Sequence, residues 1–450
     1  MFDILHKGLN KALEACDHAE FFGERSDLLS IDLERDEVKK LKHVKSTGIG
    51  VRVVLRGKIG FSYTTALETA KIEDCIVHAI KQAKASEEDR DFAGLPEPSK
   101  RSYKKPEKNF DQKILDLIEG GGSEDGIRYC KEMLTGMKDI EVNAAFRPTE
   151  GSFAAAHEET YVLNSEGIEI ADAGTYVAAG LQVVASEGEE EISGYEGNVS
   201  RTLADMDFTW IGSEAVKIAV GSLGGKRVQM KELPVVFSPR AVQSLLEFTL
   251  IPQLSAENVQ REQSPYYDKK GMEIASEIIT IVDDGTMPQG INSRKMDGEG
   301  IPSEATSLVE KGILKNFLYD SYTANKDAVV STGNALRNFD NLPAPGATNF
   351  IINGSSKASK EEMLAEIREG LFITDVIGAH TASRTSGDFS VVAQNTSGIK
   401  AGELFPVKQV MITGNMQEVL KHVEIIGTDT RQIYNAVSPS IMVSKLKVVS

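Results

Sequence analysis

The string AHEET at residues 156–160 comes closest to a metal-binding pattern. The zinc-protease pattern H-E-x-x-H needs two histidines one helical turn apart, so that both bind the same ion. Here His157 and Glu158 provide the first half, but Tyr161 stands where the second histidine belongs. The surrounding residues are β-branched and aromatic, which favours a strand. We therefore interpret His157 as a surface histidine beside acids.

Soft metal ligands are sparse elsewhere too. The chain has seven histidines, and no two of them lie within one turn of a predicted helix. There is no C-x-x-C pair, and no cysteine follows Cys130. Closely spaced soft ligands therefore predict no zinc site in this chain.

The loop between two predicted strands near residue 380 carries more polar chemistry. A strand ends at Asp375, a small-residue loop holds His380 and Thr381, and Asp388 enters the next strand. Polar groups on a loop held between strands often line a binding cleft, and two carboxylates with a histidine are suited to acid–base work. The alternative is a loop stabilised by its own Asp and Thr hydrogen bonds. We expect a cleft or a subunit interface here.

A second candidate is the stretch STGNALRNFDNLPAPGATNF, residues 331–350. Gly333 permits unusual backbone angles, and Asn334 and Arg337 are suited to contact a peptide or a partner. Long ordered loops are often functional. The alternative is an ordinary long connection.

Composition and charge narrow the classes of function. The 450 residues are 41% hydrophobic, which excludes a largely disordered chain. There are 67 acidic and 50 basic residues, for a net charge of −17, which disfavours direct nucleic-acid binding. Three cysteines suggest reduced thiols and a cytoplasmic protein. Neither a signal segment nor about 20 consecutive apolar residues is visible, so we expect no membrane association.

Periodicity predicts an α+β protein. Ile49, Val51 and Val53 alternate with polar or small residues as in a half-buried strand, and residues 72–83 follow helical spacing. We expect an N-terminal α/β part with a β-meander and helices at 1–95, a linker at 96–108, a middle α+β part at 109–226 and a large, mostly β C-terminal domain at 227–450.

Three local features within these parts are specific enough to compare with a structure. The group Asn164–Gly167 is typical of a hairpin turn. Pro239 marks the start of a helix, which we predict to continue through Arg240–Leu254. The segment 306–324 alternates like a second hairpin.

Five stretches together resemble one known family. They are LPVVFSPRAVQSLLE, NVQREQSPYYDKKGMEIASEIITIVDDG, GILKNFLYDSYTANK, STGNALRNFDNLPAPGATNF and LFITDVIGAHTASRTSGDFSVVAQNTSGI. The chain resembles the TldD/PmbA family, the "modulator of DNA gyrase" group related to zinc metalloproteases, over nearly its whole length. The string TDVIGAHTASRTSGDFSV is similar to the PmbA (TldE) branch.

The resemblance locates a degenerate zinc helix. In the TldD branch the helix after the first C-terminal strand carries H-E-x-x-x-H, and a later cysteine completes the metal site. The matching helix here, Arg240–Leu254, keeps Glu247 but has no histidine, and the late cysteine is absent. A zinc-activated water needs such ligands, so we predict no catalytic and no metal-binding residue in this chain.

The resemblance also implies a partner. PmbA-branch members pair with a TldD subunit, which supplies the zinc, in a heterodimeric protease acting on unfolded or small peptides. We therefore predict a non-catalytic subunit that binds no cofactor itself, with zinc in a TldD-like partner. The alternative is a self-standing homodimeric peptide-binding protein. A direct DNA-binding role conflicts with the net charge of −17.

Overall fold

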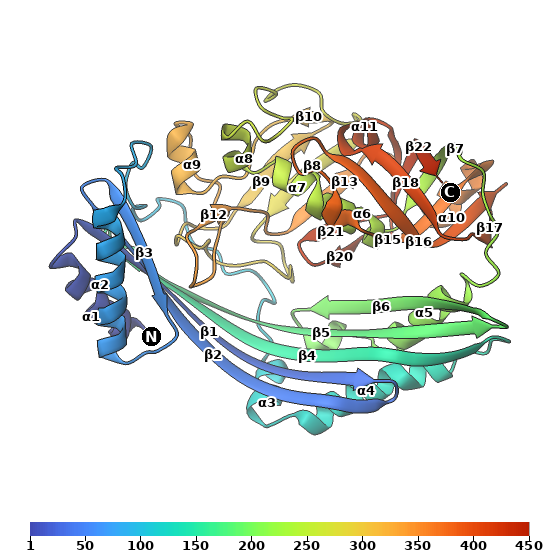
Figure 1. Cartoon of the computed structure of the whole chain (residues 1–450), viewed down its shortest axis with the longest axis horizontal. Helices are drawn as coiled ribbons and strands as arrows, with labels where there is room; N and C mark the ends of the chain where they lie inside the picture. The colour runs from blue at the N-terminus through green and yellow to red at the C-terminus, as the bar shows by residue number, and fades with distance from the viewer. Residues whose placement is uncertain (450) are drawn as a thin grey trace.

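One long antiparallel sheet runs through the first 226 residues. The computed structural model describes residues 1–449, and Figure 1 shows the long strands (blue to green) running beneath the C-terminal part (yellow to red). Six strands pair in the order β3-β2-β1-β4-β5-β6. Their bounds are β1 His18–Glu34, β2 Glu37–Leu55, β3 Lys58–Thr64, β4 Ala145–Asn164, β5 Glu169–Glu187 and β6 Glu190–Ser200.

The N-terminal and middle parts share this sheet but have separate cores. β1 pairs with β4 from Glu20 opposite Asn164 to Glu34 opposite Glu150, so the sheet continues across both parts. One core lies under α1 and α2, and the other under α3, α4 and α5. The helices are α1 Phe2–Leu13, α2 Thr69–Ala85, α3 Gln112–Glu119, α4 Ser123–Lys138 and α5 Phe208–Val220, and η1 Leu203–Asp205 is a short 3-10 turn.

Strand alternation decides which residues face the C-terminal part. Side chains of successive strand residues point to opposite faces. On β1, Phe21 and Ile31 lie in the helix-covered cores, whereas Phe22 and Glu24 lie on the opposite face, toward the C-terminal part. On β4, Glu158 also lies on that opposite face. The face turned away from the helices therefore carries charged residues in the middle of the sheet.

The C-terminal part consists of two sheets packed around one core. In the larger sheet the pairings run in a closed circuit, β7–β22–β18–β16–β15–β7, with β14, β19 and β17 attached. Its strands are β7 Lys231–Phe237, β14 Lys357–Ala358, β15 Glu369–Ile377, β16 Asp388–Lys400, β17 Glu403–Pro406, β18 Val410–Asn415, β19 Val423–Gly427 and β22 Ile441–Val449. The α+β fold predicted from the sequence is thereby confirmed.

The second C-terminal sheet and the short helices complete this part. The sheet order is β10-β9-β8-β13-β21-β20, and β11 pairs with β12 separately. The strands are β8 Ile279–Asp284, β9 Ala305–Glu310, β10 Ile313–Leu314, β11 Ala335–Leu336, β12 Ala344–Pro345, β13 Phe350–Gly354, β20 Arg431–Ile433 and β21 Ala436–Ser438. The helices are α6 Pro239–Phe248, α7 Leu250–Gln253, α8 Ala256–Gln260, α9 Ser321–Lys326, α10 Lys360–Glu366 and α11 Met416–Lys421, and η2 Ala379–Thr381 is one 3-10 turn.

Local patterns predicted some elements correctly and missed two boundaries. The hairpin at Asn164–Gly167 is confirmed as the β4–β5 turn, and α6 begins at Pro239 as predicted. The predicted helix to Leu254 is interrupted, because α6 ends at Phe248 and the short helix α7 covers Leu250–Gln253 after a break at Thr249. The ring of Pro252 is incompatible with helical hydrogen bonding to the carbonyl four residues earlier.

The predicted hairpin over 306–324 is also only half right. β9 and β10 form it, but the segment that follows is helix α9. The side chain of Asp320 accepts a hydrogen bond from the Thr323 backbone N–H at 2.8 Å, and the Thr323 hydroxyl bonds back to the Asp320 N–H. This capping box stabilises a helix start and outweighs the alternating pattern.

Segment 96–108 has no regular structure but is held against its neighbours. Pro96 accepts a hydrogen bond from Asn164 at 2.8 Å, and the Tyr103 hydroxyl donates to the Gly300 carbonyl at 2.8 Å. Arg101 donates to the Ser331 carbonyl at 2.8 Å and pairs with Glu304. The segment therefore connects the sheet to the C-terminal part through direct contacts.

A buried ion network joins the two halves of the molecule. Glu20 on β1 accepts from Arg52 on β2 at 2.8 Å and pairs with Arg337 of the C-terminal part. Arg52 also contacts Glu299 at 3.1 Å, and Glu299 accepts from the Ser321 hydroxyl at 2.6 Å. Burial by itself raises the pKa of Glu20, but the two guanidinium groups outweigh it and hold that pKa below its ordinary value.

Removing Glu20 should destabilise the protein strongly. Glu20→Ala leaves Arg337 buried without its carboxylate, and breaking a buried pair in this way costs about 3–5 kcal/mol. The matched control is Glu34→Ala on the same strand, where an exposed pair with Lys39 is lost and the expected cost is below about 1 kcal/mol. Urea unfolding midpoints of both variants measure this. Equal shifts of the two urea midpoints would show that the buried network contributes no more to stability than an exposed ion pair.

Candidate functional site

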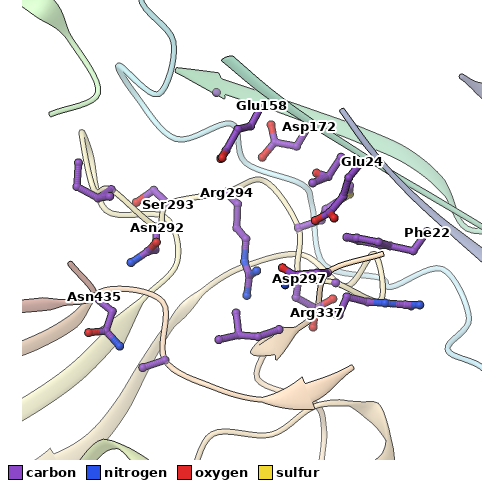
Figure 2. A pocket seen from close by; sticks show the side chains of 18 of the residues that line it. Phe22, Glu24, Glu158, Asp172, Asn292, Ser293, Arg294, Asp297, Arg337 and Asn435 are labelled. Atoms are coloured by element: carbon purple, nitrogen blue, oxygen red, sulfur yellow. The ribbon is translucent and has the colours of Figure 1, made fainter. Parts of the chain in front are cut away.

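A cavity of about 840 Å³ lies between the charged face of the long sheet and the C-terminal part. Figure 2 shows its side chains converging from both sides. The sheet wall includes Phe22 and Glu24 of β1, Glu158 of β4 and Asp172 of β5. The other wall is built by segments 291–298 and 336–347, the end of α6 and the loop at 434–435.

The sheet wall is acidic because of strand register. Glu24 stands opposite Thr160, and Thr160 stands opposite Asp172, so the three lie on one face. Within residues 1–449, no side-chain nitrogen of Lys, Arg or His lies within 4 Å of the carboxylates of Glu24, Glu158 or Asp172, although Asp172 accepts the backbone N–H of Lys295 at 2.6 Å. Partial burial raises the pKa of Glu24. The three carboxylates therefore line the cavity without cationic partners, with Glu158 exposed and Glu24 and Asp172 half-buried.

The opposite wall contains a guanidinium that forms no ion pair among the described residues. Arg294 donates from Nη2 to the Ala335 carbonyl at 3.3 Å, and its Nε has no partner. Burial lowers the pKa of Arg294. Figure 2 shows the side chain reaching toward the middle of the group of lining residues. Arg294 is thus placed to bind an anionic or carbonyl oxygen.

Asp297 lies beside Arg294 and is almost fully buried. Its carboxylate accepts backbone N–H groups of Glu299 and Ile301 at 2.9 Å each and of Ala335 at 3.1 Å. Burial, followed by the nearby charge of Glu299, raises the pKa of Asp297 to about 7. Asp297 therefore shapes the loops of this wall, and its charge changes near neutral pH.

The loop 336–347 forms an apolar rim that is fixed to the sheet. The guanidinium of Arg337 lies 4.7 Å from the ring centre of Phe22. Phe339 packs onto β2 at Gly48, where a Cβ atom would overlap the ring, and its N–H donates to Glu24 at 2.9 Å. Leu336 and Leu342, which are both partly exposed, line the cavity. Apolar and charged surfaces therefore meet in one site.

The residues predicted from the sequence fall into three places. Arg337 and Glu247 line the cavity. Asn334 lies behind its wall, fully buried, and donates to Asp283 at 2.6 Å and to the Gly346 carbonyl at 3.0 Å. Asp375 lines a separate cavity of about 210 Å³ and accepts from the Ser244 hydroxyl at 3.3 Å.

The loop residues lie outside these cavities, on the surface. His380 is exposed, and its ring centre lies 6.4 Å from that of Phe248. The Thr381 hydroxyl donates to the Gly378 carbonyl at 2.8 Å. Asp388 accepts from Asn415 at 2.8 Å and from Ser386 at 2.6 Å, and these bonds lower its pKa. The structure therefore does not bring Asp375, His380 and Asp388 together as a catalytic group.

Sequence reasoning missed most of the cavity. Glu24, Asp172, Arg294 and Asp297 were not singled out, and Glu158 was considered only as part of a zinc pattern. The position of Glu24 on β1 follows from alternation, but pairing β1 with β4 requires the tertiary fold. No motif marks Arg294 or Asp297.

Comparison with known proteins identifies the family. Sequence profiles described as PmbA/TldA metallopeptidase domain 1, central domain and C-terminal domain match residues 19–86, 121–223 and 230–450. The chain belongs to the TldD/PmbA family. It is 36% identical to an uncharacterized protein of Methanocaldococcus jannaschii over 92% of both chains. A "Metalloprotease TldD homolog" of Buchnera aphidicola is 26% identical over 92% of this chain and 86% of that protein.

The fold agrees with that assignment. The crystal structure of TldE from Thermococcus kodakarensis superposes with a TM-score of 0.89 at 24% identity, covering 99% of this chain and all of that one. One relative is thus named TldD and one structural neighbour TldE. These names support the family resemblance found in the sequence, and they do not separate its two branches.

A metallopeptidase family implies a metal, so the donors at α6 were compared with what zinc requires. Gln243 and Glu247 lie one turn apart, and the Gln243 amide donates to Glu247 at 2.6 Å. Among residues 1–449, no group of three or more His, Cys, Asp or Glu side chains is arranged to hold a metal ion. Zinc sites use three or four imidazole, thiolate or carboxylate ligands, and Glu247 is a single carboxylate beside an amide. The side chains at this position of the TldD/PmbA fold therefore do not fit zinc.

The same described range also bears on membranes. None of its helices combines the length and apolar character needed to cross a bilayer.

Asp297 should make stability fall as pH rises. The folded protein keeps this carboxyl protonated up to about pH 7, whereas an unfolded Asp loses its proton near pH 4. Folding therefore takes up a proton in this window, so the free energy of unfolding decreases between about pH 4 and pH 7 and then levels off. Asp297→Asn cannot titrate and should show a shallower decrease.

Urea midpoints from pH 5 to pH 8 measure this difference. Asp36→Asn, in the exposed turn between β1 and β2, is the control and should follow the wild type. A slope for Asp297→Asn as steep as the wild-type slope would contradict the role given to Asp297.

Proposed function

We propose that this chain is the non-catalytic, PmbA/TldE-like subunit of a TldD/TldE-type metalloprotease. The proposal rests mainly on one observation: the family fold extends along the chain, yet α6 presents Glu247 at the cavity, bonded to Gln243, and carries no histidine. In this proposal the zinc belongs to a TldD-like partner, which carries out the hydrolysis of unfolded or small peptides.

The cavity supports a role with peptides. Its volume of about 840 Å³ falls within the range of sites for small ligands, about 300–1,000 Å³. Its wall combines apolar side chains such as Leu336 and Leu342 with carboxylates, amides and guanidinium groups. A peptide offers the same combination of apolar side chains and hydrogen-bonding groups.

Reconstitution with the partner tests the proposal. The chain and a TldD-like chain carrying H-E-x-x-x-H are expressed separately and together, and hydrolysis of β-casein, an unfolded substrate, is assayed with zinc measured by elemental analysis. We expect co-purification, hydrolysis by the pair, and zinc only where the TldD-like chain is present. The control is a TldD-like chain whose motif histidines are alanine, which should remove hydrolysis but not association.

Two results would overturn the proposal. Hydrolysis by this chain alone, with tightly held zinc, would show that it is catalytic. A stable homodimer that does not bind the TldD-like chain would favour the alternative, a self-standing peptide-binding protein.

The loop at 378–388 should affect the pair and not the fold. His380 is exposed, and exposed substitutions usually change stability by less than about 0.5 kcal/mol. If this loop contacts the partner, His380→Ala should keep its melting temperature and lose several-fold in affinity for the TldD-like chain, about 1 kcal/mol. His78→Ala, an exposed histidine on α2, is the control. A drop in melting temperature with unchanged affinity would instead indicate a structural loop.

A further inference from the structure

Charges of opposite sign face one another across the cavity without meeting. On the sheet side, the carboxylates of Glu24 and Glu158 have no cation within 4 Å among the described residues. On the other side, the guanidinium of Arg294 has no carboxylate within 4 Å. Glu158 is exposed, and Glu24 and Arg294 are half-buried, so each charge can be reached from the cavity while it remains unpaired. The two walls therefore offer a negative and a positive subsite that do not satisfy each other.

The other two arginines that line the cavity already have partners within the chain. Arg201 donates to the backbone carbonyls of Thr175 at 3.1 Å and Gly290 at 3.2 Å, and also to Ile291 and Ser293. Arg337 pairs with Glu20. Arg294 is therefore the guanidinium of this wall with the fewest partners.

Unpartnered polar atoms provide a second, independent observation. Among residues that line the cavity, the donors Nε of Arg294 and Nη2 of Arg337 have no partner, and neither do the acceptors Oδ1 of Asn109 and Asn435. Asn109 is only 3% exposed, and the side chain of Arg337 is fully buried. Because buried polar atoms are nearly always hydrogen-bonded, these donors and acceptors show that the polar groups behind the cavity lining are not fully satisfied by the described residues.

Apolar side chains line the same cavity as the two charged subsites. Phe22, Met296, Leu336 and Leu342 all line the cavity, and Leu342 remains 42% exposed. A purely ionic ligand would leave these side chains unused. The lining therefore fits a molecule with an ammonium group, a carboxylate and an apolar side chain.

We propose that this cavity binds short peptides through both of their free termini. The peptide's ammonium group lies at Glu24 and Glu158, its carboxylate lies at Arg294, and its side chains pack against Leu336 and Leu342. This inference rests on the proposed function, because it gives the TldE-like subunit a binding site of its own for the small peptides that the pair handles.

Binding by the full chain alone tests the inference. The probes are Ala-Leu-Ala, its N-acetyl form and its C-terminal amide, titrated calorimetrically at low salt. We expect the free peptide to bind and each blocked form to bind at least about tenfold more weakly, since each loses one charged contact. Equal affinity for all three, or no binding of Ala-Leu-Ala, would overturn the inference. If only the amide binds well, the site is one for cations.

Paired variants locate the two subsites. Glu158→Gln should weaken binding of the free peptide but not binding of the acetylated peptide. The matched control is Glu159→Gln, whose side chain lies on the opposite face of β4, 4.0 Å from Arg25, and which should bind like the wild type. Arg294→Gln should weaken binding of the free peptide but not binding of the amide. Its control is Arg128→Gln, at a surface arginine, which should bind like the wild type. If Arg294→Gln does not fold, Arg294→Lys keeps the charge but not the planar donor pair and should still bind more weakly.

The failures of the two proposals can be told apart. One result is that this chain binds peptides and prefers those with free termini, but gives no hydrolysis with a TldD-like chain. That result would contradict the subunit assignment and leave the binding site standing. Hydrolysis by the pair, with unaltered rates for Glu158→Gln and no peptide binding by this chain, would leave the subunit assignment and remove the site.

Discussion

The relative position of the two halves of this protein depends on four buried charges. Glu20 and Arg52 come from the long sheet, and Glu299 and Arg337 come from the C-terminal part. A buried network of this kind adds little net stability, because desolvation offsets the attraction. It does specify geometry, because any sliding of the C-terminal part over the sheet would leave buried charges unpaired. The cavity walls are thereby held at one spacing.

The same burial that makes the network specific also perturbs its neighbours. Glu24 lies four residues after Glu20 on β1, on the same face as Glu20 and Phe22. Asp297 lies two residues from Glu299. Both carboxyls have raised pKa values because their surroundings exclude water. In the network the opposite charges of Arg52 and Arg337 reverse that effect for Glu20. Pairing with a guanidinium therefore decides whether the pKa of these carboxyls is lowered, as for Glu20, or raised, as for Glu24 and Asp297.

Sequence patterns predicted what is local and missed what is long-range. Alternation along β2 and the turn at Asn164–Gly167 depend on neighbouring residues, so they were predicted correctly. The pairing of β1 with β4 joins segments more than a hundred residues apart, and no local pattern encodes it. Glu247 and Arg337 were found through a family helix and a glycine-rich loop, whereas Glu24 and Arg294 have no such marker. Asp375 and Asp388 are close in sequence, but on antiparallel β15 and β16 they lie opposite Gln394 and Asn415, in different parts of the sheet.

The network also explains why the cavity cannot neutralise itself. Arg294 would gain a carboxylate partner if the loop wall moved toward Glu158, and the closing of empty space is normally favoured by packing. That movement would carry segment 336–347 with it, because Arg294 and Asp297 both bond to the Ala335 backbone. Arg337 and Phe339 in that segment are held by Glu20 and Glu24. Closing the cavity would therefore break a buried ion pair in order to make another, with no net gain. The walls remain apart, and the unpaired charges on them are left for a ligand that carries both signs.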